Sequence, residues 1–323
     1  MTTPSTLLRQ LTTWHRPLVV YAALTVPAIL FTIGGLIVDD RVVDGAPIWL
    51  KPMKFLVSTL VYTITWAWMF TKQTRPRRWM WWTGTVSAVL LALEMVIIIG
   101  QVVRGTASHF NNVSQFDTNL FTIMGVAITV VWVLNMIQGV VMFRDRIADR
   151  PMALAIRLGV VLGSIGIALA FLMLGPTDDQ LAALDHGGTS DRIGAHTVGL
   201  ADGGPGMPLT GWSTVGGDLR IPHFIGIHGM QFLPLVALAL MLLAPRVRRL
   251  ADETVRLRLV GVAAGGYAGL TALVLWQALR GQSLIRPDGL TLAAAGLLLV
   301  AVGLGVRYAL SARTPAKDLE ASA

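Results

Sequence analysis

One short stretch, GGDLRIPHFIGIHGMQFLP at 216–234, carries polar side chains into the start of an apolar run. Its chemistry-bearing residues are Asp218, Arg220, His223, His228 and Gln231. Ionisable side chains within a membrane segment are costly and usually mark a functional site. His223 and His228 are five positions apart, about 140° around a helix, so one helix cannot chelate a metal with both. Any metal or haem site here needs ligands from other segments.

Two further histidines lie beside apolar runs. His109 is in RGTASHFNN and His196 is in RIGAHTVGLADGGPGMP. Neutral imidazole is a common ligand for transition metals and for haem iron. With His223 and His228 they form a set of four candidate ligands, of which two must lie at one depth on facing segments. The alternative for each histidine alone is a local hydrogen bond or helix cap.

An acidic residue lies deep in the run LLALEMVIIIGQVVRG. Glu94 is ten positions before Arg104, which places it roughly 15 Å deeper along a helix. Gln101 lies on nearly the same helical face, so we predict a polar column of Arg104, Gln101 and Glu94. The column would meet His228 and Gln231 and would carry protons or hold a ligand headgroup. The alternative is a neutral Glu94 hydrogen-bonded between helices.

Basic residues are placed at the ends of several apolar runs. Lys51 and Lys54 begin one run, Arg220 begins another, and Arg104 and Arg280 end two more. Helix N-termini with added Lys and Arg form anion sites. We therefore predict that these five residues bind an anionic group. The alternative is that their long side chains reach lipid phosphates individually.

The composition indicates an all-α integral membrane protein, since 54% of the residues are hydrophobic and only 14% are charged. Runs of roughly 20 apolar residues are typical of membrane-spanning helices. We predict eight, at 17–38, 48–70, 79–103, 118–143, 153–174, 222–244, 257–279 and 290–310. These helices must position the candidate residues.

The charge distribution predicts the orientation. Alternating the eight spans puts 18 of the 26 basic residues on the side of the termini and 8 on the other. Cytoplasmic loops carry the excess of Lys and Arg, so both termini are expected in the cytoplasm, with the site facing outside. The same rule accounts for the net charge of +8. The expected partner is therefore the lipid bilayer and not nucleic acid. The chain has no cysteine, which excludes disulfides and thiolate ligands.

A weak internal repeat predicts two parallel four-helix halves. WLKPMKFLVS aligns with DLRIPHFIGI, and QVVRG matches QALRG in the same order. Parallel membrane repeats often have sites between them. The predicted divisions are a cytoplasmic segment 1–16, halves at 17–150 and 151–310, and a disordered tail 311–323. Chance similarity of short helix ends is the alternative.

The second half contains a long outer loop at 175–221, which is rich in Gly and Pro and has no helical period. Loops of this length are usually functional or disordered. We expect an ordered lid with Asp202, Trp212, Asp218 and His196 pointing into the site.

The motifs WLKPMKF, RGTASHFN, HTVGLADGGPGMP, GWSTVGGDLRIPHFIGIHGMQ and WQALRGQ together resemble a family of bacterial multi-pass membrane proteins. The resemblance covers 48–288 and implies the inner membrane as location but no activity. The plan of four plus four helices is also similar to haem A synthase. This chain departs from that family because it has no histidine in its fourth or eighth run and no cysteine pair.

Several functions remain open. The first is a membrane oxidoreductase with haem or a transition metal, in which the basic residues pair with propionates or an anionic substrate. Its acid–base and polar residues would be Glu94, Gln101, Gln231 and Asp218. The second is a transporter or binding protein for an anionic small molecule or lipid headgroup. A zinc-dependent hydrolase with three histidine ligands and a structural subunit are further alternatives.

Overall fold

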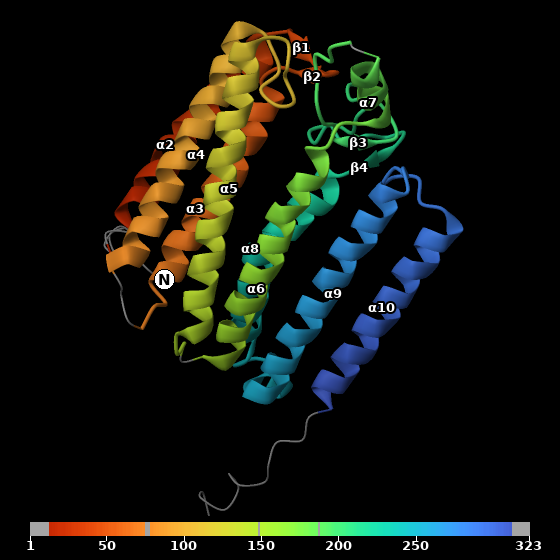
Figure 1. Cartoon of the computed structure of the whole chain (residues 1–323). Coiled ribbons are helices and arrows are strands. Elements are labelled where there is room, and N and C mark those ends of the chain that lie inside the picture. The colour runs from red at the N-terminus through yellow and green to blue at the C-terminus, as the bar shows by residue number, and fades with distance from the viewer. Residues whose placement is uncertain (1–12, 75–77, 148, 187, 312–323) are drawn as a thin grey trace, which may run out of the picture.

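The computed structural model is a bundle of long helices that run side by side (Figure 1). It describes residues 13–74, 78–147, 149–186 and 188–311. Eight helices in this described part are long and apolar enough to cross a membrane. The prediction of an all-α protein with eight such helices is confirmed. Most of the predicted terminal segments, 1–16 and 311–323, lie outside the described residues.

The helix boundaries agree with the predicted runs to within a few residues. The long helices are α2 (Arg16–Val38), α3 (Leu50–Phe70), α4 (Arg78–Arg104), α5 (Gln115–Arg144), α6 (Arg150–Ala168), α8 (Arg220–Leu243), α9 (Glu253–Leu279) and α10 (Gly289–Leu310). The fifth candidate span joins α6 to the short helices that follow it, η1 (Leu169–Met173) and α7 (Asp178–Asp185). A further short helix, η2 (Arg248–Ala251), precedes α9.

Side-chain caps fix where several helices begin. The side chains of Ser114, Asp149, Asp252 and Asp288 each accept a hydrogen bond from a backbone N–H in the first turn of α5, α6, α9 and α10. Such caps satisfy donors that have no partner inside the helix. The loops between these helices therefore begin and end at defined residues.

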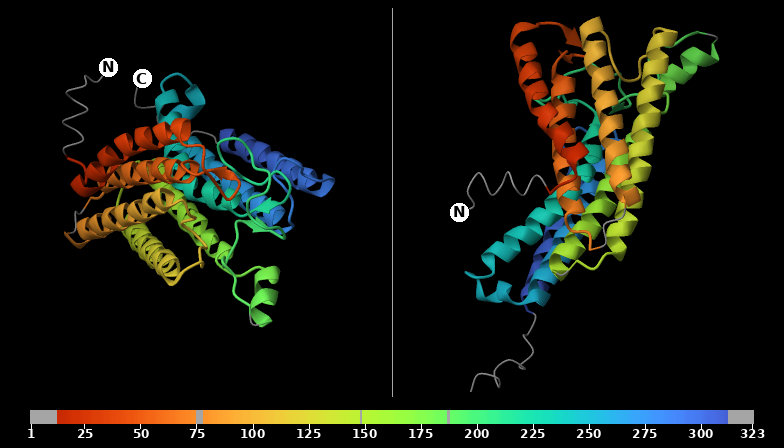
Figure 2. Two further views of the ribbon diagram at one scale, coloured as in Figure 1. Left: turned by 90° about the horizontal axis from the view of Figure 1, so that it is seen from above. Right: turned by 90° about the vertical axis from the view of Figure 1, so that its left-hand side faces the viewer.

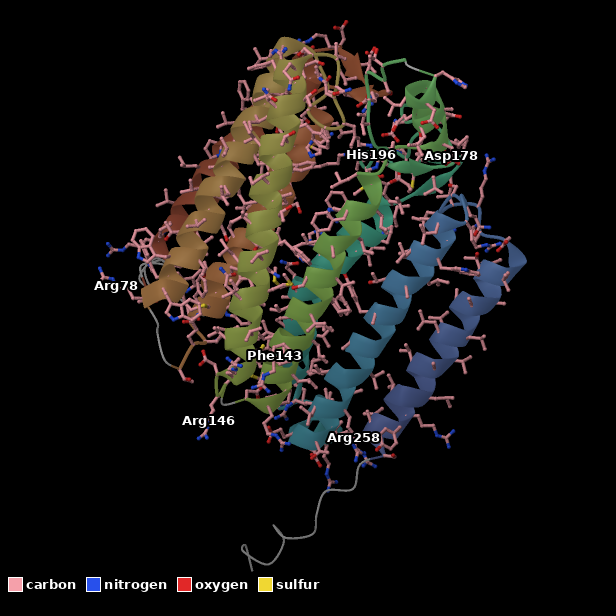
Figure 3. All side chains as sticks on the ribbon, in the orientation of Figure 1. Arg78, Phe143, Arg146, Asp178, His196 and Arg258 are labelled. Carbon is pink, nitrogen blue, oxygen red and sulfur yellow. The ribbon has the colours of Figure 1, made fainter. Side chains whose placement is uncertain are left out.

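The two ends of the bundle differ. One end carries α7 and four two-residue strands, which form the antiparallel pairs β1 (Val42–Val43) with β2 (Ala46–Pro47) and β3 (Thr197–Val198) with β4 (Gly217–Asp218) (Figure 1). Figure 3 shows Arg78, Arg146 and Arg258 toward the opposite end. We call the end with α7 and the four strands the loop-rich end. The three labelled arginines lie toward the other end of the bundle.

The long loop predicted at 175–221 contains a short helix, α7, although its sequence has no helical period. Thr177 and Gln180 form a capping box, in which each side chain bonds the backbone of the other residue. This local pattern favours a helix start without an apolar face. Accordingly no residue of α7 is buried, and the helix projects beyond the bundle (Figure 2).

Helices α6 and α8 pack backbone against backbone. A Cβ placed on Gly166 would lie 2.1 Å from the backbone nitrogen of Ile227, and one on Gly226 would lie 2.6 Å from the Cα of Gly166. Small residues permit such close approach between membrane helices. This contact fixes the start of α8, which carries Arg220 and His223, against α6.

Asn135 on α5 joins three helices. Its Oδ1 accepts hydrogen bonds from Trp66 Nε1 at 3.0 Å and Tyr62 OH at 3.3 Å on α3, and its Nδ2 donates to Ser164 Oγ on α6 at 2.8 Å. Asn135 is fully buried. Amide hydrogen bonds of this kind hold membrane helices together, and this one holds α3, α5 and α6 around the space described next.

Candidate functional site

Two adjoining cavities lie toward the loop-rich end. The larger, which we call the basic cavity, has a volume of about 470 Å³ and is lined by Lys51, Lys54 and Arg220. Lys51 and Lys54 are in the first two turns of α3, and Arg220 is the first residue of α8. The positive ends of two helix dipoles therefore add to three cationic side chains.

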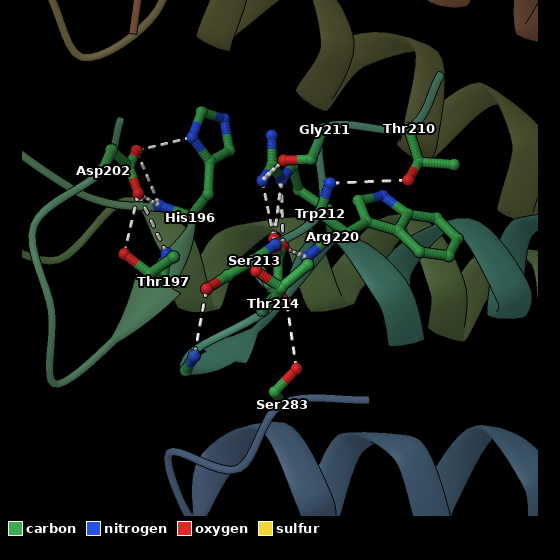
Figure 4. A network of polar contacts seen from close by, with 12 residues as sticks. His196, Thr197, Asp202, Thr210, Gly211, Trp212, Ser213, Thr214, Arg220 and Ser283 are labelled. Atoms are coloured by element: carbon green, nitrogen blue, oxygen red, sulfur yellow. Dashed lines mark hydrogen bonds and ion pairs between the residues drawn. The ribbon is translucent and has the colours of Figure 1, made fainter. Parts of the chain in front are cut away.

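Two of these three cations have partners within the protein. Arg220 forms an ion pair at 2.6 Å with Asp218, which is fully buried, and also donates to the carbonyl of Gly211 at 2.7 Å (Figure 4). Lys54 Nζ donates to the carbonyl of Thr210 at 2.5 Å. Lys51 has no hydrogen bond or ion pair with any residue that the structure describes. It is the unpaired cation of the basic cavity.

His196 and Asp202 organise the loop above the cavity. The Asp202 carboxylate accepts hydrogen bonds from His196 Nδ1 at 2.6 Å and from the backbone N–H of Thr197 at 3.0 Å (Figure 4). Burial lowers the pKa of His196, and this outweighs the opposite effect of Asp202. Burial alone would raise the pKa of Asp202, but the hydrogen bonds from His196 and Thr197 hold it below its usual value. The pair is a neutral imidazole and a carboxylate.

The smaller cavity, which we call the histidine cavity, has a volume of about 200 Å³ and is lined by His109, His196, His223 and Glu94. Glu94 is only 5% exposed. Its carboxyl forms no hydrogen bond with the described residues, so it is available to a group inside the cavity.

The three histidines share one arrangement. Nδ1 of His223 bonds the carbonyl of Gly166 at 2.7 Å, and Nδ1 of His196 bonds Asp202. Carbonyl and carboxylate oxygens only accept, so Nδ1 carries the proton and Nε2 of the neutral ring has the lone pair. Nδ1 of His109 contacts Ser108 Oγ at 3.0 Å, and burial lowers the pKa of His109 well below its ordinary value. Within the described part of the chain, no Nε2 of the three has a hydrogen-bond partner.

Phe110 is a site residue that the sequence did not reveal. Its ring lies 4.9 Å from that of His196, centroid to centroid, and its backbone has φ of 57°. Positive φ is uncommon for a bulky residue and is found at functional sites. The carbonyl of Phe110 accepts from Ile193 N–H at 3.1 Å, so pairing with the long loop holds this conformation. Sequence patterns carry no signal for it.

The structure places the other predicted residues away from both cavities. Gln101 and Arg104 bind Asp117 on α5, and Arg280 pairs with Asp288. The predicted polar column is therefore divided, since Glu94 faces the histidine cavity without contacting Gln101 or Arg104.

The start of α8 is divided in the same way. His228 and Gln231 share a face as predicted, with 3.3 Å between Nδ1 and Oε1, but Gln231 then donates to Thr65 on α3. They do not meet Glu94, because the rotation of α8 turns His223 to the cavity instead. Asp218 is likewise the buried partner of Arg220 and lines neither cavity.

A metal centre needs several ligands close together. Among the described residues, no group of three or more His, Cys, Asp or Glu is arranged to hold a metal ion. Of the predicted set, His109, His196 and His223 line one cavity and His228 does not.

Comparisons of the chain with protein-family models, curated proteins and solved structures found no match. The fold defines the class, a multi-pass helical membrane protein, through its eight long apolar helices. Its particular activity must be inferred from the two cavities.

Proposed function

We propose that the protein binds an anionic small molecule or a lipid headgroup in the basic cavity, as a transporter or binding protein. The observation that carries this proposal is the unpaired ammonium group of Lys51 beside Lys54 and Arg220. Lys51 is partly buried, and a charge withdrawn from water without a direct partner is costly. A phosphate or carboxylate would supply the missing partner of Lys51 and accept from Lys54 as well.

The proposal extends to the membrane orientation. We propose that the chain lies in a bacterial inner membrane with both termini in the cytoplasm and the cavities toward the outside. The 18 to 8 division of basic residues supports this. Two parallel four-helix halves are part of the same proposal, supported by the similar hydrogen bonds at the ends of α4 and α9.

A membrane oxidoreductase with haem or a transition metal is the second candidate. It is favoured by the three imidazoles whose Nδ1 atoms are engaged and whose Nε2 atoms are not, since metal-binding histidines are commonly oriented in this way. Glu94 would transfer protons in that case. Elemental analysis of the purified protein tests it: about one iron or copper per chain would support this candidate.

Anion binding is tested by titration calorimetry with methyl phosphate and acetate. Lys51→Ala removes the unpaired cation and is expected to weaken binding about ten-fold or more, the effect of a lost charge-assisted hydrogen bond. Lys72→Ala is the matched control, because Lys72 lies after α3 and stacks on Trp68 instead. Equal binding by wild type and Lys51→Ala would refute the proposal.

A further inference from the structure

The two cavities are neighbours that share part of their lining. Phe55, Phe224, His196 and Arg220 line both of them. A molecule with its charge beside Lys51 would thus have its remaining atoms at the entrance to the histidine cavity. This inference rests on the proposed binding of an anion in the basic cavity.

The histidine cavity has two unlike walls. The wall formed by α3, α4 and α8 carries polar residues such as Thr59, Glu94 and His223 among apolar ones. The wall formed by α5, α6 and η1 is apolar, with Met124, Ile128, Ile167 and Phe171 among its residues. Such a division matches a molecule with polar groups next to its head and a hydrocarbon chain beyond them.

The apolar wall reaches the outer surface of the bundle. Phe171 in η1 is 39% exposed and Leu174 is 41% exposed, although both line the cavity. In a membrane these exposed apolar surfaces face lipid. The apolar wall of the cavity is therefore also part of the lipid-facing surface of the bundle next to η1.

We propose that the anion is the head of a membrane amphiphile, whose hydrocarbon chain lies in the histidine cavity and enters from the bilayer between α5 and η1. The head binds Lys51 and Lys54, and the region next to it meets the polar wall. A freely soluble anion would use the basic cavity alone and leave the apolar wall unoccupied.

Gly125 offers a selective test. It lines the histidine cavity, and a Cβ placed on it meets no atom within 4 Å, so Gly125→Phe fills the cavity without a clash at the backbone. Gly296→Phe on α10 is the matched control, since Gly296 has the same free space and lines neither cavity. Ala170→Phe in η1, also at the apolar wall, is a second filling variant in case Gly125→Phe does not fold.

Binding of dodecyl phosphate and of methyl phosphate is measured by calorimetry on protein in phosphatidylcholine nanodiscs, with empty nanodiscs subtracted. Comparing variant with wild type cancels partitioning of the long-chain probe into the bilayer. Gly125→Phe is expected to weaken dodecyl phosphate about ten-fold or more, as loss of a few buried methylene contacts implies, and to leave methyl phosphate unchanged. Gly296→Phe should change neither.

The remaining outcomes separate the two proposals. If both probes bind, depend on Lys51, and are unaffected by either filling variant, the amphiphile is refuted and soluble-anion binding stands. If methyl phosphate and acetate bind to wild type and Lys51→Ala equally, or do not bind at all, the proposed anion site fails, and the amphiphile with it.

Discussion

Two helix ends in this protein have the same pattern, Q-x-x-R-G, and the same backbone construction. At the end of α4, Gln101 Nε2 donates to the carbonyl of Ala107 at 3.3 Å, and at the end of α9, Gln277 Nε2 donates to that of Ser283 at 2.8 Å. Each acceptor is six positions after its glutamine. The glycine that follows has positive φ in both, 74° and 69°.

The two ends differ in burial. Arg104 pairs with Asp117 of α5, whose side chain is only 5% exposed and also accepts from Gln101 and Ser114. Arg280 pairs with Asp288, the N-cap of α10, whose side chain is 40% exposed. Water can take the place of the exposed Asp288 as the partner of its arginine, but it cannot reach the buried Asp117.

The loops that follow the two ends also differ. The loop after α4 supplies His109 to the histidine cavity, whereas no described residue of 277–288 lines either cavity. Ser283 instead donates to the carbonyl of Ser213 at 3.2 Å (Figure 4). One motif thus closes two helices equally well, and the chemistry of each end depends on which side chains its loop carries.

The acidic partners should give the largest contrast. Asp117→Ala leaves three donors without their acceptor and is expected to lower the free energy of unfolding by about 2–3 kcal/mol. Asp288→Ala should cost less, about 1 kcal/mol, because water replaces the exposed ion pair and the loss is mainly that of the α10 N-cap. Thermal unfolding of both variants in one detergent measures the difference. Equal losses would break the distinction between the two ends.

A fall in pH should lower stability mainly through the loop after α4, which carries His109. Burial, together with the charge of Lys51, holds the pKa of His109 below its ordinary value of 6.5, and burial also lowers that of His196. The unfolded chain then binds more protons below pH 6.5, so stability is present above that pH and is lost as the pH falls. Unfolding at pH 7.5 and 5.5 should show a smaller loss for His109→Gln than for wild type. An unchanged pH dependence would contradict this.

The glutamines form a matched pair. Gln101→Leu and Gln277→Leu each remove one of two donors to a loop carbonyl, since Asn111 Nδ2 still donates to Ala107 and Arg286 N–H to Ser283. Each loss costs about 1 kcal/mol, and Gln101→Leu costs more because it also removes a donor to Asp117. Only Gln101→Leu should also weaken dodecyl phosphate binding, because its loop carries His109 into the cavity. Calorimetry on the two variants checks this. A binding defect in Gln277→Leu alone would place the binding site at the end of α9 and contradict this prediction.

The glycines should give the smallest and most equal effects. A Cβ on Gly105 would lie 3.5 Å from Arg41 Nη1, and one on Gly281 would lie 3.7 Å from the carbonyl of Val198, both ordinary contacts. Gly105→Ala and Gly281→Ala therefore cost only the left-handed backbone conformation, about 1 kcal/mol each. Chemical or thermal unfolding tests this, and a clear difference would reveal an unrecognised contact at one end.

Hydropathy predicted the helices closely, because roughly 20 apolar residues in sequence are a long-range and redundant signal. The run predicted at 48–70 became α3, Leu50–Phe70. The capping box at Thr177 and Gln180 was a readable signal for α7 that apolar periodicity does not contain.

The partners of individual side chains were less predictable. Helical spacing placed Gln101 and Arg104 on one face, but it gives no rotation of α4 relative to its neighbours, so their binding to Asp117 did not follow. For the same reason His223, rather than His228, lines the cavity with Glu94. The positive φ of Phe110 depends on pairing with a segment some eighty positions away.

The glycine contact between α6 and α8 has a mechanical consequence. Gly166 and Gly226 bring the two backbones together where the Gly166 carbonyl also holds His223. A crossing this tight cannot widen by side-chain rearrangement alone. His223 therefore keeps a fixed position at the wall of the cavity. We therefore expect any widening of the cavity to occur away from His223, and a crosslink between α5 and η1 to slow ligand exchange while leaving the imidazoles in place.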